Sequence, residues 1–314
     1  MTGIRRGPTS SAIRSAPPAP GTRIDDVTVA YRLAVGMSAD VFAVWHHALL
    51  TPLVCKRVRP ADLDNAAHRR RLRLEGQALA VLAHPGIVRL VEQRHDVPLP
   101  YLLLEHVGER SLRHVLKADG ALETGAAVRI VQHVAAAVAH VHANGFLHRD
   151  LKPSNIVLRG GRPVLLDFGV VWRLAPRRRP PDRSGTPQYL APEQVAREPL
   201  TPAADVWGLG VLLYELLTAE RPFPTGPQAA GTPLAERYPQ ISEPPRPPAT
   251  SVPSALARVI GACLEKAPGA RPRSAVDVAR ALDPFTDVKV WPARLGGAFD
   301  PFGRRPGSRR RLVA

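Results

Sequence analysis

The chain has 314 residues, of which 45% are hydrophobic, and a formal net charge of +16. This composition supports a substantial core and excludes a chain that is disordered throughout, and the length suits one large domain or two modest ones. The positive charge comes from 38 arginines against 5 lysines, without aromatic residues interleaved among them. A general excess of arginine explains the charge, so nucleic acid is not expected as the main partner.

The two cysteines and the N-terminal segment set further limits. Cys55 and Cys263 lie far apart, each among apolar neighbours, which fits neither a disulfide framework nor a zinc site. The N-terminal segment lacks the apolar stretch of a secretory signal, and no apolar run reaches the ~18 residues of a membrane span. The sequence therefore predicts a soluble protein of the cytoplasm, and it carries no signal for an oligomeric state.

In chain order, residues 1–25 come first; they are rich in Pro, Ser and Arg and predict a disordered tail. Residues 26–107 favour a small β-rich lobe, because short segments rich in β-branched and aromatic residues follow one another between turns. A single helix is expected from residue 65 to residue 83. The expected strands are residues 27–35, 40–48, 51–59, 86–96 and 100–107.

Residues 108–284 predict a larger, mainly helical lobe. A long helix with apolar residues at helical spacing is expected to end at Gly145, a residue type common just after helices. Residues 204–220 are apolar on most faces, which is typical of a buried helix. Two more helices and a flexible basic tail complete the chain, at residues 253–268, 274–284 and 285–314. The expected fold class is α+β, with two lobes and a ligand site in the cleft between them.

Lys56 and Glu75 are charged residues in apolar surroundings. Lys56 lies in the strand segment "LVCKRV", and Glu75 shares a helix face with Leu72 and Leu79. A buried ammonium or carboxylate is costly unless an opposite charge accompanies it. Each residue alone is explained more simply as an exposed charge, but the two together make an ion pair a candidate.

The segment "FLHRDLKPSN" presents Asp150, Lys152 and Asn155 directly after the long helix, and Asp167 follows the apolar segment "PVLL" soon afterwards. Carboxylate and amide oxygens suit Mg²⁺ when phosphate oxygens complete its coordination. Each of these segments alone is compatible with an ordinary polar loop, whereas their combined spacing favours one charged ligand.

These motifs, in this order, resemble those of eukaryotic-like (Hanks-type) bacterial serine/threonine protein kinases. The resemblance covers roughly residues 26–284. It rests on the following segments: "VCK" with Lys56, the helix with Glu75, "HRDLKPSN" at 148–155, "DFG" at 167–169, "GTPQYLAPE" at 185–193, "DVWGLG" at 205–210 and "RP" at 271–272. Each motif is weak alone, and the ordered set is very specific.

The resemblance implies ATP and Mg²⁺ (or Mn²⁺) as ligands, with a two-lobed kinase fold around them. Lys56 would contact the α- and β-phosphates and would be held by Glu75. Asp167 would chelate the Mg²⁺ ion that bridges the β- and γ-phosphates, and Asn155 would bind a second ion. Catalysis of phosphoryl transfer then rests on alignment and on positive charge at the equatorial oxygens.

The resemblance also implies roles at the acceptor side. Asp150 would accept or orient the proton of the attacking hydroxyl of a protein substrate, and Lys152 would offset charge on the γ-phosphate. Thr186 is similar to the threonine that approaches the catalytic Asp and marks Ser/Thr specificity. Glu193 would pair with Arg271 in a structural and partly buried ion pair.

The adenine ring would sit between the lobes. By resemblance, Val41 and Val54 would cover one of its faces. Leu104 falls at the gatekeeper position, and Glu105 and Val107 would offer backbone hydrogen bonds. Val54 is larger than the alanine usual in the family and would narrow this pocket.

The glycine-rich loop departs from the family pattern. "AVGMSA", residues 34–39, keeps only Gly36 of the three glycines, so Val35 and Gly36 would contact the phosphates from a loop with less freedom. We expect weaker ATP binding or slower turnover than a full glycine pattern gives, and restored glycine at Ala34 and Ala39 should raise kcat/KM for ATP.

By resemblance, the segment "VVWRLAPRRRPPDRSGTPQY" at residues 170–189 belongs to the activation segment, and it carries few Ser and Thr hydroxyls, at Ser184 and Thr186. Arg149, which precedes the catalytic Asp, pairs in similar kinases with a phosphorylated activation segment. A phosphate on Ser184 could be held by the arginine cluster at residues 177–179, although that run is equally compatible with a solvated loop.

Three functions remain open at this stage. The first is an active protein kinase that phosphorylates Ser/Thr of protein substrates, including itself. The second is a pseudokinase-like scaffold that binds nucleotide with weak or no transfer, as the loop at residues 34–39 would allow. The third is a small-molecule kinase of related fold, which "GTPQYLAPE" and Arg271 argue against.

Overall fold

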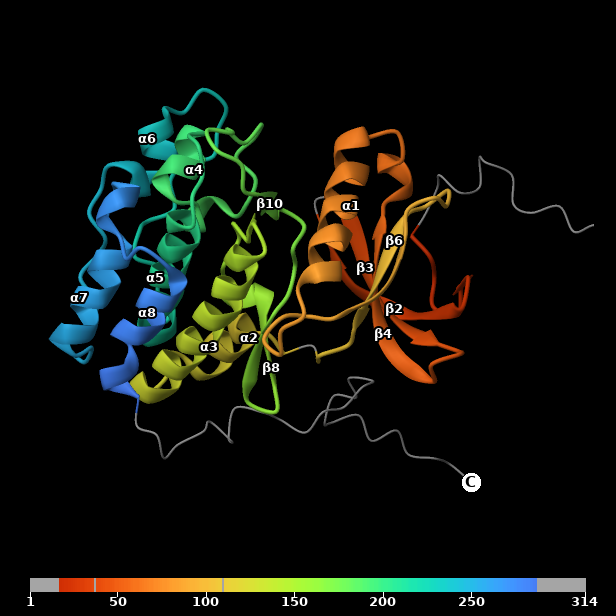
Figure 1. Cartoon of the computed structure of the whole chain (residues 1–314), viewed down its shortest axis with the longest axis horizontal. Helices are drawn as coiled ribbons and strands as arrows, with labels where there is room; N and C mark the ends of the chain where they lie inside the picture. Colours follow the sequence, from red (N-terminus) through yellow and green to blue (C-terminus); the bar gives the residue numbers. More distant parts are fainter. Residues whose placement is uncertain (1–16, 37, 109, 287–314) are drawn as a thin grey trace, which may run out of the picture.

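The computed structural model describes residues 17–286 except 37 and 109, and it forms two lobes that lie side by side (Figure 1). The junction between the lobes is here called the cleft. One lobe is a curled sheet with a helix against it, and the other is mainly helical. The predicted α+β class with two lobes is confirmed. The expected tails lie largely outside the described residues.

The first lobe is an antiparallel six-stranded sheet with the strand order β1-β2-β3-β4-β6-β5. β1 lies within the segment that the sequence predicts as a disordered tail. Its residues are ordered because they pair with β2 and so extend the edge of the sheet. The strands are β1 Arg23–Ile24, β2 Val27–Val35, β3 Ala39–His46, β4 Thr51–Val58, β5 Leu90–Arg94 and β6 Tyr101–Glu105.

The helix of this lobe is α1, Ala66–Val81, close to the span predicted from the sequence. It begins after Asn65, whose side-chain oxygen accepts hydrogen bonds from two backbone N–H groups of the first turn at 3.0 and 3.3 Å. Its buried side packs against β4, β5 and β6. α1 therefore covers the sheet face that looks toward the other lobe (Figure 1).

The register of the sheet decides which side chains face the cleft. Cross-strand partners share a face of a sheet, and neighbours along one strand alternate between faces. Lys56 pairs with Val41 and with Leu102, so these three share the face toward the cleft. Cys55 lies on the opposite face, in a separate apolar cluster with Phe42.

The second lobe contains helices α2 Leu112–Asp119, α3 Thr124–Ala143, α4 Pro192–Ala196, α5 Ala203–Thr218, α6 Leu234–Arg237, α7 Ser254–Cys263 and α8 Ala275–Ala281. Two small antiparallel sheets lie beside the cleft, formed by β7 Phe146–Leu147 with β10 Trp172–Arg173 and by β8 Ile156–Arg159 with β9 Arg162–Leu165. In α5 every residue from Ala203 to Leu217 is buried, as predicted.

Two features of this lobe bear on the site. α3 ends as expected just before Gly145, which adopts a positive φ of 78°. α2 is absent from the sequence-based prediction, although Ser111 caps its start and Gly120 follows its end. Within residues 17–286 as described, no helix is long and apolar enough to cross a membrane.

Candidate active site

A lysine and two carboxylates from separate elements meet at the cleft. Nζ of Lys56 in β4 lies 2.7 Å from Oε1 of Glu75 in α1 and 2.7 Å from Oδ1 of Asp167, which follows β9. The ion pair expected between Lys56 and Glu75 is present. The Glu75 side chain is 1% exposed and that of Asp167 is 48% exposed, so Lys56 joins the interior to the open cleft.

These neighbours fix the charges of the group. Burial disfavours the ammonium of Lys56, but the carboxylates of Asp167 and Glu75 outweigh it and raise the pKa of Lys56 above its ordinary value. The charge of Lys56 in turn holds the pKa of Asp167 well below its usual range. Lys56 is therefore cationic and Asp167 anionic at neutral pH, as the binding of phosphate oxygens and of a hard metal ion requires.

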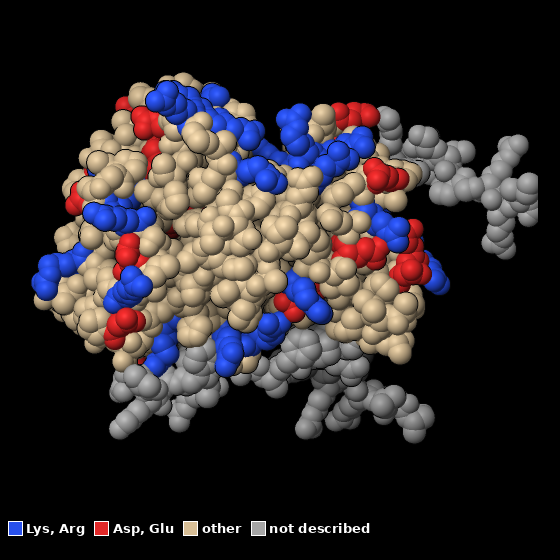
Figure 2. Space-filling model, viewed as in Figure 1, with Lys and Arg blue, Asp and Glu red and all other residues tan. Residues whose placement is uncertain are grey.

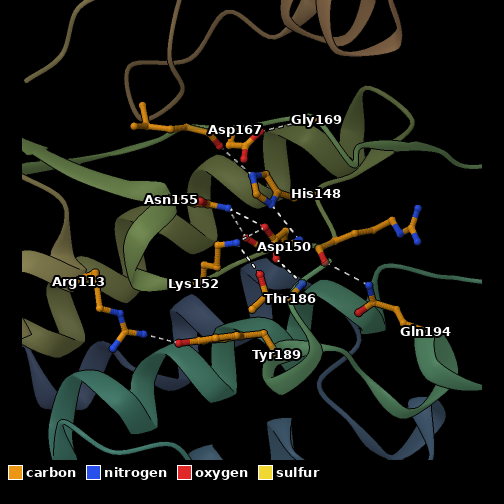
Figure 3. A network of polar contacts seen from close by, with 12 residues as sticks. Arg113, His148, Asp150, Lys152, Asn155, Asp167, Gly169, Thr186, Tyr189 and Gln194 are labelled. Atoms are coloured by element: carbon orange, nitrogen blue, oxygen red, sulfur yellow. Dashed lines mark hydrogen bonds and ion pairs between the residues drawn. The ribbon is translucent and has the colours of Figure 1, made fainter. Parts of the chain in front are cut away.

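Asp150 lies at the centre of a second group of polar residues (Figure 3). Its Oδ2 accepts hydrogen bonds from Lys152 Nζ at 2.6 Å and from Asn155 Nδ2 at 3.0 Å. Its Oδ1 accepts one from the Thr186 N–H at 2.9 Å, and Lys152 Nζ lies 2.5 Å from Thr186 Oγ1. The fold thus brings together the four residues that the sequence places in the loop after β7 and in the segment before α4.

Asp205, in the first turn of α5, holds the loop that carries Asp150. Its two carboxylate oxygens accept the backbone N–H groups of His148 at 2.9 Å and Arg149 at 2.8 Å. Arg149 has a φ of 70°, a conformation that a non-glycine residue adopts only when its surroundings impose it. The motif "DVWGLG" does not by itself reveal this function of Asp205, although an acid at the start of a mostly apolar, buried helix is a usable signal.

Asp167 is also held in a left-handed conformation, with a φ of 44°. Its Oδ1 accepts a hydrogen bond from the Gly169 N–H at 3.1 Å. The N–H of Phe168, the residue between them, donates to Glu75 Oε1 at 3.1 Å. The backbone after β9 is therefore tied to α1, and this turns the carboxylate of Asp167 toward the cleft.

The donor set fits a hard divalent cation. Asn155 directs its Nδ2 to the backbone carbonyl and to the carboxylate of Asp150, at 2.9 and 3.0 Å, which leaves its Oδ1 as a ligand oxygen. Asp167 contributes an ionised carboxylate. Among the described residues no group of three or more His, Cys, Asp or Glu could hold a metal by itself, so phosphate and water oxygens would complete the coordination.

The cleft face of the sheet carries the apolar residues expected around adenine. Val54 pairs with Leu104 across β4 and β6 and lies two residues before Lys56. Val41 pairs with Lys56, and Val107, which follows β6, is buried. The side chains of Val41, Val54 and Leu104 share the face on which Lys56 lies, so a flat apolar ligand there would lie beside the charged group.

Val35 and Glu105 differ from the rest of the expected pocket. Each pairs with a residue on the opposite face, Asp40 and Leu53 respectively. The Glu105 carboxylate binds the Arg159 side chain at 2.7 Å, and the Glu105 N–H donates to the Arg89 carbonyl at 2.9 Å. Neither side chain lies on the cleft face, so a ligand there meets only their backbones.

The turn between β2 and β3 needs its one remaining glycine. A Cβ on Gly36 would lie 2.7 Å from the carbonyl oxygen of Ala39, which accepts the Gly36 N–H at 2.9 Å. Ala39 itself is only 2% exposed, so loss of its methyl group would weaken the sheet. Ala34 is exposed and pairs with Val41 on the cleft face. Of the two positions at which a restored glycine is expected to raise kcat/KM, Ala34 is therefore the one where the change should disturb the sheet less.

We expect Ala34→Gly to raise kcat/KM for ATP by about two- to fivefold, because a glycine allows the N–H groups of the loop to approach phosphates more closely. Steady-state kinetics with varied ATP would measure it. Ala48→Gly, an exposed change in the next turn of the sheet, is the matched control. An unchanged kcat/KM in Ala34→Gly would contradict this explanation of the loop.

Glu193 and Arg271 form the buried ion pair that the sequence predicts. Two guanidinium nitrogens of Arg271 donate to the two carboxylate oxygens of Glu193 at 2.7 and 2.9 Å. Gly185, which precedes Glu193 in the chain, has a φ of 124°, and a Cβ there would lie 3.1 Å from the Arg149 carbonyl oxygen. The segment from Asp167 to Glu193, here called the activation segment, is therefore packed tightly against the loop of Asp150.

A sheet lobe and a helical lobe with these polar groups at their junction are typical of two-lobed phosphotransferases. The comparisons agree with this. The profile of the family described as "Protein kinase domain" matches residues 28–281. The chain therefore belongs to the protein kinase family.

Three similar curated proteins are named as serine/threonine-protein kinases, one of them as a probable one. The chain is 40% identical over 234 residues to the serine/threonine-protein kinase PkaA of Streptomyces coelicolor, a match that covers 71% of this chain and 42% of that protein. It is 34% identical over 220 residues to PknB of Mycolicibacterium smegmatis, covering 66% and 34%. A probable serine/threonine-protein kinase of Corynebacterium efficiens is 31% identical over 264 residues, covering 79% and 39%. The chain thus spans less than half the length of the relatives it matches.

Proposed function

We propose that this chain transfers the γ-phosphate of ATP, bound with Mg²⁺ or Mn²⁺, to serine or threonine hydroxyls of protein substrates. The observation that carries the proposal is the meeting of Asp150, Lys152 and Thr186 at hydrogen-bond distances. They lie beside the same cleft as the Lys56–Asp167 pair. Membership of the protein kinase family supports the same reaction.

Each residue has a separate task in this reaction. Asp150 accepts the proton of the substrate hydroxyl as its oxygen bonds to the γ-phosphorus and the bond to the bridging oxygen of ADP breaks. Lys152, beside Asp150, stabilises the negative charge on the equatorial oxygens of the transferred group. Lys56 binds the α- and β-phosphates, and Glu75 holds its ammonium in place.

Asn155 and Asp167 would hold the divalent cation. When bound, the cation supplies positive charge that neutralises the β- and γ-phosphate oxygens. Asp167 also fixes Lys56 from the cleft side, so the same carboxylate orders both the lysine and the metal position. Val41, Val54 and Leu104 bind the adenine ring, and the backbone at Val107 provides its hydrogen bonds.

The preference for Ser or Thr over Tyr follows from the position of Thr186, which limits the space beside Asp150. Its Oγ1 and its N–H bind Lys152 and Asp150, so the activation segment lies close to the proton acceptor. A short side chain brings its hydroxyl to Asp150 while the peptide backbone lies outside. The longer tyrosine side chain would place its hydroxyl beyond this position.

Three peptides that differ only in the acceptor, Ser, Thr or Tyr, test this proposal. With ATP and Mg²⁺, the protein should phosphorylate the Ser and Thr peptides and not the Tyr peptide. Nucleotide binding measured by calorimetry in parallel separates the alternatives. Binding of ATP without phosphate on any peptide or on the protein itself would favour the nucleotide-binding scaffold, which the reduced glycine content at residues 34–39 makes the second candidate.

A further inference from the structure

Asp182 joins the activation segment to α1. Its Oδ2 accepts a hydrogen bond from an Nη of Arg71 at 2.5 Å, and its Oδ1 accepts the Ser184 N–H at 3.1 Å and the Ser184 hydroxyl. The same Arg71 nitrogen donates to Ser184 Oγ at 2.9 Å. One carboxylate and one guanidinium thus enclose the Ser184 hydroxyl, which connects two segments that are more than 100 residues apart in the chain.

This connection reaches both halves of the proposed active site. Arg71 lies four residues before Glu75 on α1, so the two project from nearby positions of one helix. The ion pair of Arg71 with Asp182 therefore helps to fix the position of α1, from which Glu75 binds Lys56. On the other side, Ser184 lies two residues before Thr186, whose N–H donates to Asp150. Asp182 is therefore placed to align the lysine and the proton acceptor together.

The surroundings of Asp182 are rich in positive charge. Figure 2 shows lysine and arginine side chains on both sides of the upper notch between the lobes, over α1 and over the region of α4 and β10. Buried Arg149 donates to the Ser184 carbonyl oxygen at 3.4 Å and lies over the Trp172 ring, as Arg178 does. Guanidinium groups gathered in this way repel one another unless an anion lies among them. Asp182 supplies this anion next to Arg71.

The hydroxyl groups of the activation segment already have structural partners. Residues 167–193 contain Ser184, Thr186 and Tyr189. Ser184 is 7% exposed and bound as described, and Thr186 binds Lys152. The Tyr189 hydroxyl donates to Glu215 at 2.7 Å. The side chain that reaches Ser184 Oγ is Arg71 rather than a member of the arginine cluster at residues 177–179. A phosphate on Ser184 would add charge directly beside the Asp182 carboxylate.

In kinases, phosphate groups order activation loops by pairing with arginines, and this controls the Lys–Glu pair. We propose that Asp182 does this work in the present chain: it is a positioning residue that holds α1 and the activation segment in the aligned state without phosphorylation of that segment. The inference rests on the proposed phosphotransfer function and adds how the site is kept active.

The test uses the full chain, treated with a protein phosphatase until its intact mass shows no phosphate. Initial rates of peptide phosphorylation are then measured, together with the melting temperature. Asp182→Asn removes the charge and half of the acceptor capacity without a change of shape. We expect kcat to fall by at least about tenfold, as for loss of a charge-assisted hydrogen bond that aligns the site, with KM for peptide little changed. Glu198→Gln, which removes an exposed carboxylate five residues beyond the activation segment, should stay within about twofold of the parent.

A double-mutant cycle distinguishes positioning from a general loss of stability. Arg71→Gln should lower kcat as much as Asp182→Asn, and the double variant should be no worse than either, because both changes break one interaction. Additive losses that follow the melting temperature would overturn the positioning role. Ser184→Ala should keep most of the activity, since the Arg71–Asp182 ion pair remains.

The inference and the proposed function fail differently. If the dephosphorylated parent is inactive and gains activity as phosphate appears on Ser184 or Thr186, the inference is wrong and the function stands. The same holds if Asp182→Asn is as active as the parent. If the parent transfers no phosphate in either phosphorylation state, the proposed function itself fails.

Discussion

Lys56→Met is expected to lower kcat by about 10²- to 10³-fold, the loss typical when a preorganised charge at the reacting group is removed. The variant keeps the length of the side chain but not its ammonium, which lies 2.7 Å from both Glu75 and Asp167. Phosphate oxygens in the cleft would then face the Asp167 carboxylate without a neutralising charge. Kinetics with saturating ATP measure the effect, and Lys117→Met, an exposed lysine of α2, is the control for loss of a lysine.

The same change should also destabilise the fold, because Glu75 would remain as a buried carboxylate without its cation. Removal of one partner of such a pair costs about 3–5 kcal/mol. In the double variant Lys56→Met/Glu75→Gln no buried charge is left, so much of the stability should return while the activity stays low. Recovery of activity along with stability would contradict the role assigned to the lysine.

Arg271→Met is also expected to have a large effect on stability, a loss of about 3–5 kcal/mol in the free energy of unfolding. The side chain is buried and binds the Glu193 carboxylate through two nitrogens. It also donates to the backbone carbonyls of Ala203, Glu265 and Lys266 at 2.7 to 3.0 Å. Its removal leaves an uncompensated buried charge and several carbonyls without this donor.

Urea unfolding measures this loss, with Arg273→Met as the control, since Arg273 is an exposed arginine two residues away. A double variant with Glu193→Gln should regain part of the lost stability. A free energy of unfolding for Arg271→Met within about 0.5 kcal/mol of the control would show that the pair contributes little, as exposed ion pairs do.

The sequence predicts those parts of the site whose residues occur in short motifs. Lys56 and Glu75 could be paired because each is a charge among apolar residues, and the ion pair is present. Asp150 and Asn155 lie five residues apart, so one loop brings them together. The strands around residues 27–58 were predictable because segments rich in β-branched and aromatic residues alternate there with short turns, and their observed ends differ by a residue or two.

Other features depend on tertiary structure and leave little local signal. α2 is only eight residues long, which is too short for a clear helical period. Arg71 lies in a run of arginines on α1, and nothing in that run distinguishes it from its exposed neighbours. Only the folded chain brings it to Asp182. Likewise, β1 is recognisable only from its pairing with β2.

Transfer of labelled γ-phosphate from ATP to a generic basic protein, by the wild-type chain and by Asp150→Asn side by side, tests the central claim most directly. Asn preserves the shape of the side chain but cannot take the proton from the acceptor hydroxyl, a task that contributes about 10²- to 10⁴-fold. The proposed mechanism predicts label on Ser or Thr with the wild-type chain and a loss in this range with the variant, while both bind ATP. Equal labelling by the two proteins, or no labelling by a wild-type chain that binds ATP and Mg²⁺, would contradict it.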